Sequence, residues 1–380
     1  MNAQRPFPAE RAPGQAAGFP QSAPPRTGPG REQARAAVAR HGAGPQARAP
    51  RPVLACINGT PAADAVVHHA RMLADALGEP LVILQVREPR NGHGREPADP
   101  VEWAIAEREA RARLDELARS AGQAAHGCET MLAQGWAPDA IRQAARRVSA
   151  GVIVLAITDH PSAAASALDE PARLPLLGRT ESHVLASSGH SVLLHPPSSS
   201  GRASEPFRRI LVPLDGSCWA EAALPMAIRL ARNAGADLLL AHVVAEPKLT
   251  GQQLPQPEDL ELLEQLVARN ERAGRLYLER MRRAVVDQAV RVDTLIFRSA
   301  DSRKGLADLI ATADFDLVVL SARGHGAIDG AELPYGSTVD YLAGRFSTPM
   351  LIVRPDMPKG QPATRSTASL PARPRIRQPR

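Results

Sequence analysis

One long segment of the sequence occurs twice, and this duplication limits the possible folds more than any other feature. VLACINGTPAADAVVHHARMLADALGEPLVILQV begins at Val53, and ILVPLDGSCWAEAALPMAIRLARNAGADLLLAHV begins at Ile210. A shift of 157 residues aligns them without a gap and pairs Asn58 with Asp215. Further along, GRTESHVLASSGHSVLLHP matches GSTVDYLAGRFSTPMLIVRP with one residue's difference in length. Similarity over two such long blocks indicates a chain built from two copies of one domain.

The duplication predicts a division of the chain into five parts. The two copies cover 52–197, the first repeat, and 207–356, the second repeat, and a short linker over 198–206 joins them. The outer segments, 1–51 and 357–380, are rich in Pro, Ala and Arg. We expect these two tails to be disordered, because folding needs enough buried apolar surface to offset the lost chain entropy.

The net charge of +6 belongs to the tails rather than to the repeats. The N-terminal tail has eight arginines and two glutamates, and the C-terminal tail has one lysine, five arginines and no acid. Residues 52–356 are therefore left with a net charge of −6. Domains that bind nucleic acid usually concentrate lysine and arginine on a folded face. We expect no specific nucleic-acid partner for the repeats.

The number of cysteines and the hydropathy of the chain indicate in which cellular compartment the protein is expected. The three cysteines, Cys56, Cys128 and Cys218, are too far apart in sequence for a zinc or redox pair. Such usage suits a reducing environment. No run approaches the roughly 18 apolar residues of a membrane span, and the N-terminal tail lacks the apolar core of a signal peptide. We expect a cytoplasmic protein with no membrane partner.

Short apolar runs alternate with amphipathic helical patterns within each repeat. In the second repeat the runs RILVPL, DLLLAHVV, VDTLIF, DLVVLSA and PMLIVRP predict five strands, and a long charged helix is predicted within 257–288. Strands that alternate with helices imply right-handed crossovers and a parallel sheet. The predicted fold class is α/β, with two tandem copies of a doubly wound, five-stranded parallel sheet. Pro225 lies inside the first helical pattern, where we expect it to bend the helix.

The residues that follow the strands are the candidates for a site. Ligands of open parallel sheets bind beyond the carboxyl ends of the strands, where the winding reverses. Pro213 and Asp215 follow the first strand of the second repeat. The carboxylate of Asp215 can accept hydrogen bonds from a base or a ribose.

A glycine-containing stretch, SARGHGAIDGAELPYGST, follows the fourth strand of the second repeat. Gly326 and Gly336 permit close approach of a ligand to the backbone. Ser337 and Thr338 begin the next amphipathic run, where amides and hydroxyls can face an anion. An ordinary helix cap explains the same spacing. The position of the stretch after a βαβαβ pattern favours a phosphate site.

These motifs resemble those of the universal stress protein family in its tandem two-domain form. The resemblance covers nearly all of 52–356 and neither tail. It is carried by VPLDGS, LLLAHVV, the loop H-G-x9-G-S and PMLIVRP. It implies a Rossmann-like fold of the adenine-nucleotide α-hydrolase type and a role in the stress response. It also implies ATP or another adenine nucleotide as ligand, with or without Mg2+.

The resemblance also implies roles for single residues of the second repeat. Asp215 corresponds to the aspartate that faces the adenine–ribose end of ATP. Val243, taken as the end of the second strand, corresponds to the valine that lines the adenine pocket. Gly326, Gly336 and Ser337 correspond to the loop that holds the ribose and phosphates.

Two departures from the family pattern qualify these roles. Arg323 stands where the family usually has the first glycine of the loop, so it either blocks the nucleotide or contacts its phosphates. In the first repeat, Asn58 replaces the aspartate and Arg179 replaces the serine. We therefore expect nucleotide binding by the second repeat only, with the first repeat as its structural, pseudo-twofold partner.

The favoured interpretation is a nucleotide-responsive binding protein rather than an enzyme. The sequence has no G-x-x-x-x-G-K-[ST] motif, and it has no recognisable catalytic or metal-binding set. A nucleotide-independent protein-interaction module is the first alternative. A slow ATPase or autophosphorylating protein is the second. An intramolecular pseudo-dimer of the repeats is expected, and a homodimer or an unidentified protein partner is compatible with the sequence.

Overall fold

The computed structural model describes eleven stretches of the chain. They are 49–59, 62–88, 100–122, 125–157, 177–196, 207–247, 256–286, 288–323, 335–343, 345 and 348–354. The chain divides into two units, 1–42 and 43–380, and all the described residues belong to the second. Gly326 of the predicted site lies outside the described residues, as do the 198–206 linker and the C-terminal tail.

Each repeat alternates strands and helices along the chain. The first repeat contains β1 (Val53–Ile57), α2 (Ala63–Leu77), β2 (Leu81–Arg87), α3 (Pro100–Ser120), β3 (Cys128–Gln134), α4 (Ala137–Arg147), β4 (Val152–Ala156), α5 (Arg179–Ser187) and β5 (Ser191–His195). The second contains β6 (Arg209–Pro213), α6 (Cys218–Glu221), α7 (Leu224–Ala234), β7 (Asp237–Ala245), α8 (Pro257–Val286), β8 (Val292–Ser299), α9 (Ser302–Thr312), β9 (Leu317–Ser321), α10 (Ser337–Leu342) and β10 (Met350–Val353).

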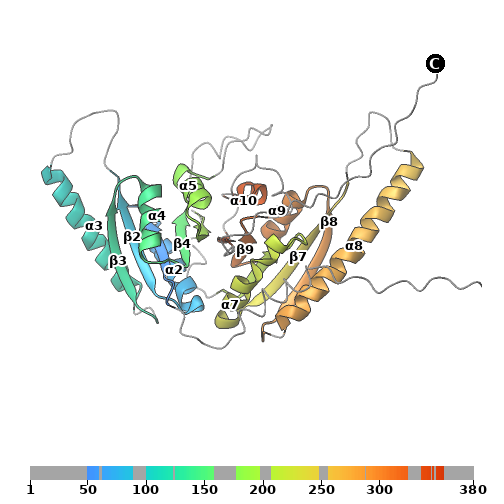
Figure 1. Ribbon diagram of the computed structural model, residues 1–380, viewed down its shortest axis with the longest axis horizontal. Coiled ribbons are helices and arrows are strands. Elements are labelled where there is room, and N and C mark those ends of the chain that lie inside the picture. The colour runs from blue at the N-terminus through green and yellow to red at the C-terminus, as the bar shows by residue number, and fades with distance from the viewer. Residues whose placement is uncertain are drawn as a thin grey trace, which may run out of the picture. The chain divides into compact units, whose positions relative to one another are not determined.

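The strands form one ten-stranded sheet in the order β3-β2-β1-β4-β5-β10-β9-β6-β7-β8 (Figure 1). All pairings within a repeat are parallel, whereas β5 and β10 pair antiparallel, with Leu193 opposite Leu351. The winding reverses between β1 and β4 and again between β6 and β9. The predicted α/β class and the doubly wound, five-stranded sheet of each repeat are confirmed.

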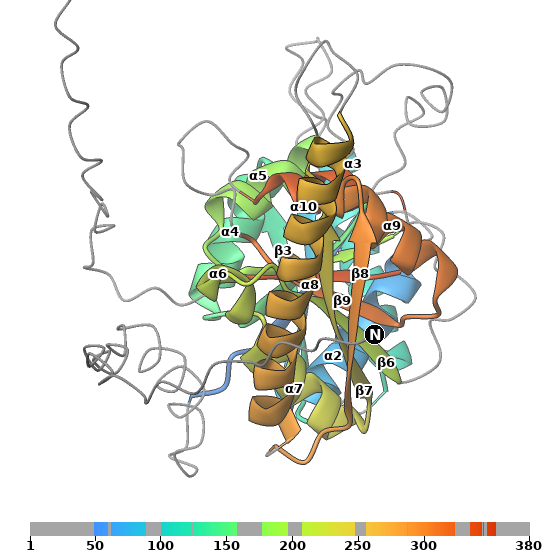
Figure 2. The same cartoon turned by 90° about the vertical axis from the view of Figure 1, so that its right-hand side faces the viewer.

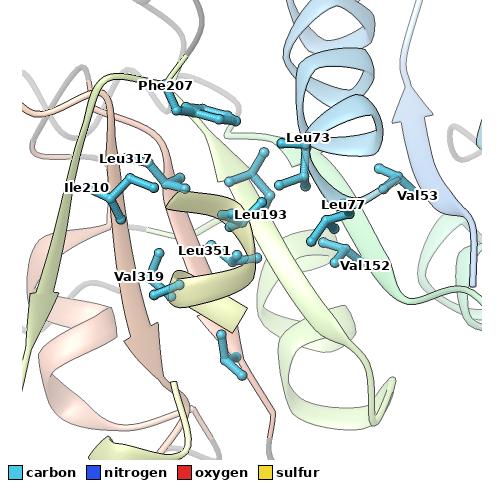
Figure 3. Packing of buried hydrophobic residues seen from close by; sticks show 14 of the residues in the cluster. Val53, Leu73, Leu77, Val152, Leu193, Phe207, Ile210, Leu317, Val319 and Leu351 are labelled. Carbon is cyan, nitrogen blue, oxygen red and sulfur yellow. The ribbon is translucent and has the colours of Figure 1, made fainter. Parts of the chain in front are cut away.

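Helices cover both faces of the sheet, and each face has its own apolar core. Alternate residues of a strand point to opposite faces, so Val53 and Ala55 belong to one core while Leu54 and Cys56 belong to the other. Helices α2, α3, α7 and α8 pack on the first face, and α4, α5, α9 and α10 on the second. Figure 3 shows side chains of both repeats gathering on the first face, with Leu193 and Leu351 near its middle.

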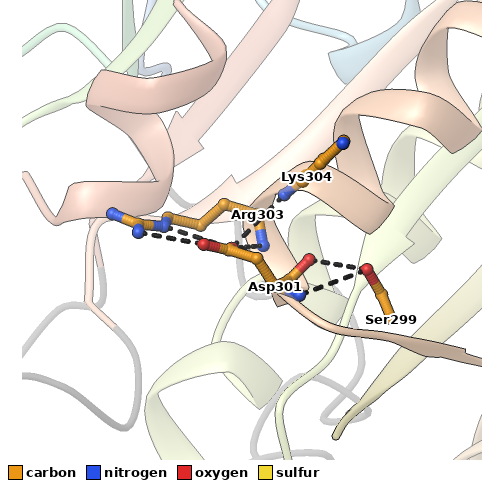
Figure 4. A network of polar contacts seen from close by, with 4 residues as sticks. All are labelled: Ser299, Asp301, Arg303 and Lys304. Atoms are coloured by element: carbon orange, nitrogen blue, oxygen red, sulfur yellow. Dashed lines mark hydrogen bonds and ion pairs between the residues drawn. The ribbon is translucent and has the colours of Figure 1, made fainter. Parts of the chain in front are cut away.

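Local signals explain where several helices begin and end. Gly78 after α2 and Gly235 after α7 adopt left-handed conformations, with φ of 63° and 69°, which terminate helices at low cost for glycine. Helix α9 begins at Asp301, whose carboxylate accepts hydrogen bonds from the amides of Arg303 at 2.8 Å and Lys304 at 3.4 Å (Figure 4). Such a cap satisfies amides that have no partner inside the helix.

The first helix predicted for the second repeat is interrupted. Helix α6 ends at Glu221, and α7 begins at Leu224 with Pro225 in its first turn. Proline has no amide hydrogen to donate, and the first turn is where this loss costs least. The expected bend is therefore a break between two helices. None of the described helices combines the length and the apolar composition that a membrane span requires.

Candidate functional site

The turn after β6 carries the first predicted site residues. Pro213 ends the strand, and the exposed Asp215 follows it. The Oδ1 atom of Asp215 accepts hydrogen bonds from the amide of Ser217 at 2.9 Å and from its hydroxyl at 2.6 Å. The Ser217 hydroxyl oxygen in turn accepts from the amide of Ala220 at 3.1 Å and caps α6. Gly216 between them has a φ of 85°, so the carboxylate is held by a short, glycine-dependent turn.

A histidine that the sequence analysis did not single out supports this turn from β7. The Nδ1 atom of His242 lies 2.8 Å from the carbonyl oxygen of Leu214. The amide of Leu214 donates to the carbonyl of Ala241, also at 2.8 Å. Residue 214 is thus tied to β7 through both of its backbone polar groups. A single polar residue in the otherwise apolar run LLLAHVV is the signal from which His242 could have been found.

The expected end of the second strand is wrong by two residues. Val243 was taken as its last residue, but β7 continues to Ala245 because Val243, Val244 and Ala245 still pair with β8. The amide of Glu246 then donates to the carbonyl of Ser299. Val243 is half-buried and lies inside the strand near its carboxyl end.

The start of α10 carries the next group of predicted residues. Gly336 precedes the helix with φ 83° and ψ 148°, a conformation that side chains other than glycine rarely adopt. A Cβ atom at this position would lie 3.4 Å from the carbonyl oxygen of Ala322, just after β9. Ser337 is exposed and Thr338 is half-buried. The end of β9 and the start of α10 therefore lie together.

Arg323 lies at the carboxyl edge of the sheet and links the two groups of predicted site residues, the Asp215 turn and the start of α10. It is exposed, and its guanidinium carbon lies 5.5 Å from the ring centroid of Trp219 on α6. Its amide donates to the hydroxyl of Ser321 at 3.3 Å. The side chain thus extends from the end of β9 toward the helix that follows the Asp215 turn. Trp219 is a second residue of this edge that the sequence analysis missed, and its position next to VPLDGSC was the available signal.

A partly buried polar group lies behind the Asp215 turn. Glu221 on α6 lies 3.7 Å from Arg280 on α8, between Oε1 and Nη2. Burial raises the pKa of Glu221, and the Arg280 charge opposes that rise. Burial, followed by the nearby charge of Glu221, raises the pKa of the Tyr277 hydroxyl. Arg280 also lies over the Tyr277 ring, 5.4 Å from its centroid. These contacts join α6, which follows the Asp215 turn, to α8.

The first repeat does not reproduce this geometry. Asn58 follows β1 where Asp215 follows β6, so the carboxylate is absent. Gly178 before α5 has a φ of −63°, in contrast to 83° at Gly336. Arg179, the residue that replaces Ser337, is exposed at the first position of α5. The two repeats thus share their strands and helices. They differ in the turn after the first strand and in the backbone before the last helix.

The comparisons with known proteins agree with this fold. The model of the universal stress protein family matches residues 50–196 and again 206–354. A crystal structure of a universal stress protein from Archaeoglobus fulgidus DSM 4304 aligns with a TM-score of 0.55 and 17% identity, covering 80% of this chain and 96% of that one. A protein of unknown function from Pseudomonas aeruginosa PAO1 aligns with a TM-score of 0.52 and 16% identity, covering 81% and 94%.

At these identities the solved structures support the fold alone, and no curated protein matches the chain by sequence. The family model, in contrast, matches most of the chain in two consecutive blocks that coincide with the two halves of the ten-stranded sheet. The chain belongs to the universal stress protein family, with two of its domains in tandem.

Proposed function

We propose that this protein binds one adenine nucleotide in its second repeat and acts as a nucleotide-responsive binding protein rather than an enzyme. Nucleotide binding is a property of the universal stress protein family. The observation that carries the assignment to the second repeat is the backbone at Gly336, whose φ of 83° has no counterpart at Gly178. Only glycine adopts this conformation at low cost, and the backbone there can come close to a ligand because glycine has no Cβ atom.

The residues of the edge have complementary roles in this proposal. Asp215 accepts hydrogen bonds from the ribose or the base, since an ionised carboxylate is an acceptor only. Val243 and Pro213 contact the base from β7 and β6. Gly336, Ser337 and Thr338 face the phosphates. Gly326, which lies outside the described residues, is assigned to the same loop by the resemblance alone. Arg323 supplies positive charge to the phosphates, which a guanidinium binds in a planar, two-pronged geometry.

The test is equilibrium dialysis of the full-length protein against labelled ATP, with and without Mg2+. We expect one equivalent of bound nucleotide. Asp215→Asn, which copies the first repeat, should weaken binding about 10- to 100-fold, because a hydrogen bond to a charged group contributes about 1.5–3 kcal/mol. Asn58→Ala at the matching position of the first repeat is the control and should bind like the wild type. Absence of uptake at high micromolar ATP, or equal losses in both variants, would contradict the proposal.

A nucleotide-independent interaction module is the second candidate, and one observation favours it. The Arg323 side chain lies over Trp219 and so extends across the space between the end of β9 and α6. Arg323→Ala separates the two functions by the direction of its effect. If Arg323 contacts phosphate, the variant binds ATP more weakly and with a smaller dependence on salt. If Arg323 closes the site, the variant binds ATP more tightly than the wild type.

A further inference from the structure

The outer face of α8 carries a row of exposed residues at the spacing of a coiled coil. The helix lies along β7 and β8 (Figure 2) and buries one face against them. On the opposite face, eight exposed residues follow one another at alternating steps of three and four. They are Asp259, Leu262, Leu266, Arg269, Ala273, Leu276, Arg280 and Arg283. We call this row the α8 seam, because two helices pack along residues with this spacing.

Three leucines of the α8 seam are exposed to solvent. Leu262 is 67% exposed, Leu266 40% and Leu276 74%. Exposed leucines that are scattered singly are ordinary, but leucines aligned on one helix face form an apolar stripe that a second surface can cover. Leu260, another exposed leucine of α8, lies outside the seam. The stripe indicates an interaction surface, and the charges beside it indicate the partner.

The charges of α8 are divided along its length. Residues 257–265 contain four acids and no base, and residues 266–286 contain six arginines and two glutamates. The two segments therefore carry net charges of −4 and +4. A second α8 that lies antiparallel brings the acidic end of each helix to the basic end of the other, whereas a parallel copy brings like charges together. The helix is thus complementary to itself in one orientation.

Ion pairs within the chain are compatible with this complementarity. Arg298 on β8 pairs with Glu264 at 2.9 Å and with Glu271 at 2.5 Å, and both glutamates lie outside the α8 seam. Arg283 of the seam lies 3.0 Å from Glu279, but its side chain is still 77% exposed. A partner can therefore reach the charged ends of the seam.

One antiparallel register brings every seam residue opposite another. In this register a twofold axis passes between the two helices beside Glu271. Each layer then joins one seam residue to one of the second copy. The layers are Leu266 with Leu276, Asp259 with Arg283, Leu262 with Arg280, and Arg269 with Ala273. The methylene groups of an arginine can cover a leucine, and alanine leaves room for a long side chain.

We propose that the α8 seam is a homodimer interface, at which a second copy of this chain packs its own α8 antiparallel. The same patch serves both copies, as a twofold axis requires. The seam contains none of the residues of the proposed nucleotide site, so the two proposals are independent. Small interfaces give weak, transient association. We expect a dissociation constant of about 100 µM, so that the chain is monomeric in the dilute solutions in which unfolding is measured.

Sedimentation equilibrium of the full-length protein tests the interface, from about 10 to 500 µM, a range that brackets the expected constant. Leu266→Asp and Leu276→Asp should each weaken dimerisation at least about tenfold, because each would bury a charge in the dimer. Leu260→Asp is the matched control and should dimerise like the wild type. A wild type that stays monomeric would contradict the proposal and leave the stripe to another segment of the chain or to another protein. Equal dimerisation of all three variants would place the dimer contact elsewhere.

An exchange of charges tests the antiparallel orientation. Asp259→Arg and Arg283→Asp should each weaken dimerisation about three- to tenfold, because each brings like charges together in two symmetry-related layers. The variant with both substitutions should recover, since opposite charges then meet again across the antiparallel seam. The two positions lie about 36 Å apart along one helix, so they cannot restore each other within a chain.

Recovery also separates the interface from a local effect on the helix. The carboxylate of Asp259 accepts a hydrogen bond from the amide of Gln256 at 3.0 Å, and the second substitution would not replace that bond. A double variant that stays as weak as the single variants would show that the antiparallel seam is wrong.

Discussion

At the residue scale, two buried histidines distinguish the first repeat from the second. His69 on α2 is 5% exposed and His195 at the end of β5 is 1% exposed, and 3.1 Å separates Nδ1 of His69 from Nε2 of His195. The same positions in the second repeat hold Met226 and Val353. Burial, followed by the charge of His69, lowers the pKa of His195 to about 4. Burial is also the main cause that lowers the pKa of His69.

These lowered pKa values predict a loss of stability in mild acid. The unfolded chain binds protons at histidine below about pH 6.5, whereas folded His195 does so only near pH 4, so the free energy of unfolding falls as the pH drops between these values. For His195 alone the loss approaches about 3 kcal/mol at the acid end. Urea titrations at pH 7.5 and pH 5 measure it.

The matched variant replaces both histidines by their counterparts, as His69→Met with His195→Val. It should lose less stability than the wild type between the two pH values. His126→Gln, at an exposed position, is the control and should follow the wild type. Equal losses in the wild type and the double variant would show that the buried pair is not responsible.

At the element scale, α8 contains a glycine, Gly274, at the point where it packs against side chains of the sheet. Figure 2 shows α8 lying along β7 and β8. Gly274 is buried in the middle of this 30-residue helix. A Cβ atom there would lie 2.6 Å from Cδ1 of Ile296 and 2.9 Å from Cδ2 of His242. The isoleucine methyl can move, but the histidine ring is held by its hydrogen bond to Leu214.

Gly274→Ala should therefore destabilise the protein despite the better helix propensity of alanine. Propensity favours alanine by about 1 kcal/mol, and overpacking costs about 1–3 kcal/mol. We expect a lower free energy of unfolding in urea. Ala273→Gly, at an exposed position of the same helix, measures propensity alone and should cost about 1 kcal/mol. A gain in stability for Gly274→Ala would show that His242 gives way without cost.

At the scale of the whole described structure, the repeats share their cores. Each of the two apolar clusters contains residues of both repeats, and β5 pairs with β10 across the junction. Beside the junction, Arg229 on α7 lies 2.8 Å from Glu79 after α2 and also donates to the carbonyl of Leu77. A shared core makes the packing of one repeat depend on the other, so we expect the two repeats to unfold together.

Leu193→Ala tests this coupling. Leu193 on β5 is fully buried, and loss of such a side chain costs about 2–5 kcal/mol. Trp103→Phe with Trp136→Phe leaves Trp219 as the single tryptophan, so that fluorescence reports on the second repeat. In that background, Leu193→Ala should lower the midpoint of unfolding followed by Trp219 fluorescence and the midpoint followed by circular dichroism by the same amount.

The control for this experiment is Leu276→Ala, because Leu276 is 74% exposed and its loss should move neither transition. Independent repeats would leave the Trp219 transition in place while the circular dichroism transition moved. That result would mean that the junction contributes little to stability.

The sequence by itself determined the duplication, the parallel α/β repeats and the edge at which Asp215 and Gly336 lie. These features depend on local patterns, since apolar periodicity defines strands and helices and a parallel sheet brings its carboxyl ends together. The break at Pro225 was foreseen as a bend for the same local reason.

Only the tertiary structure decided which groups meet across the sheet and between the repeats. It showed that β7 continues past Val243, that His242 holds the Asp215 turn, that Arg323 lies over Trp219 and that Arg229 meets Glu79. Periodicity tells which face of an element is buried but not what covers it. The contact between Arg229 and Glu79 joins residues that are distant along the chain, and neither of their local sequences carries information about the other.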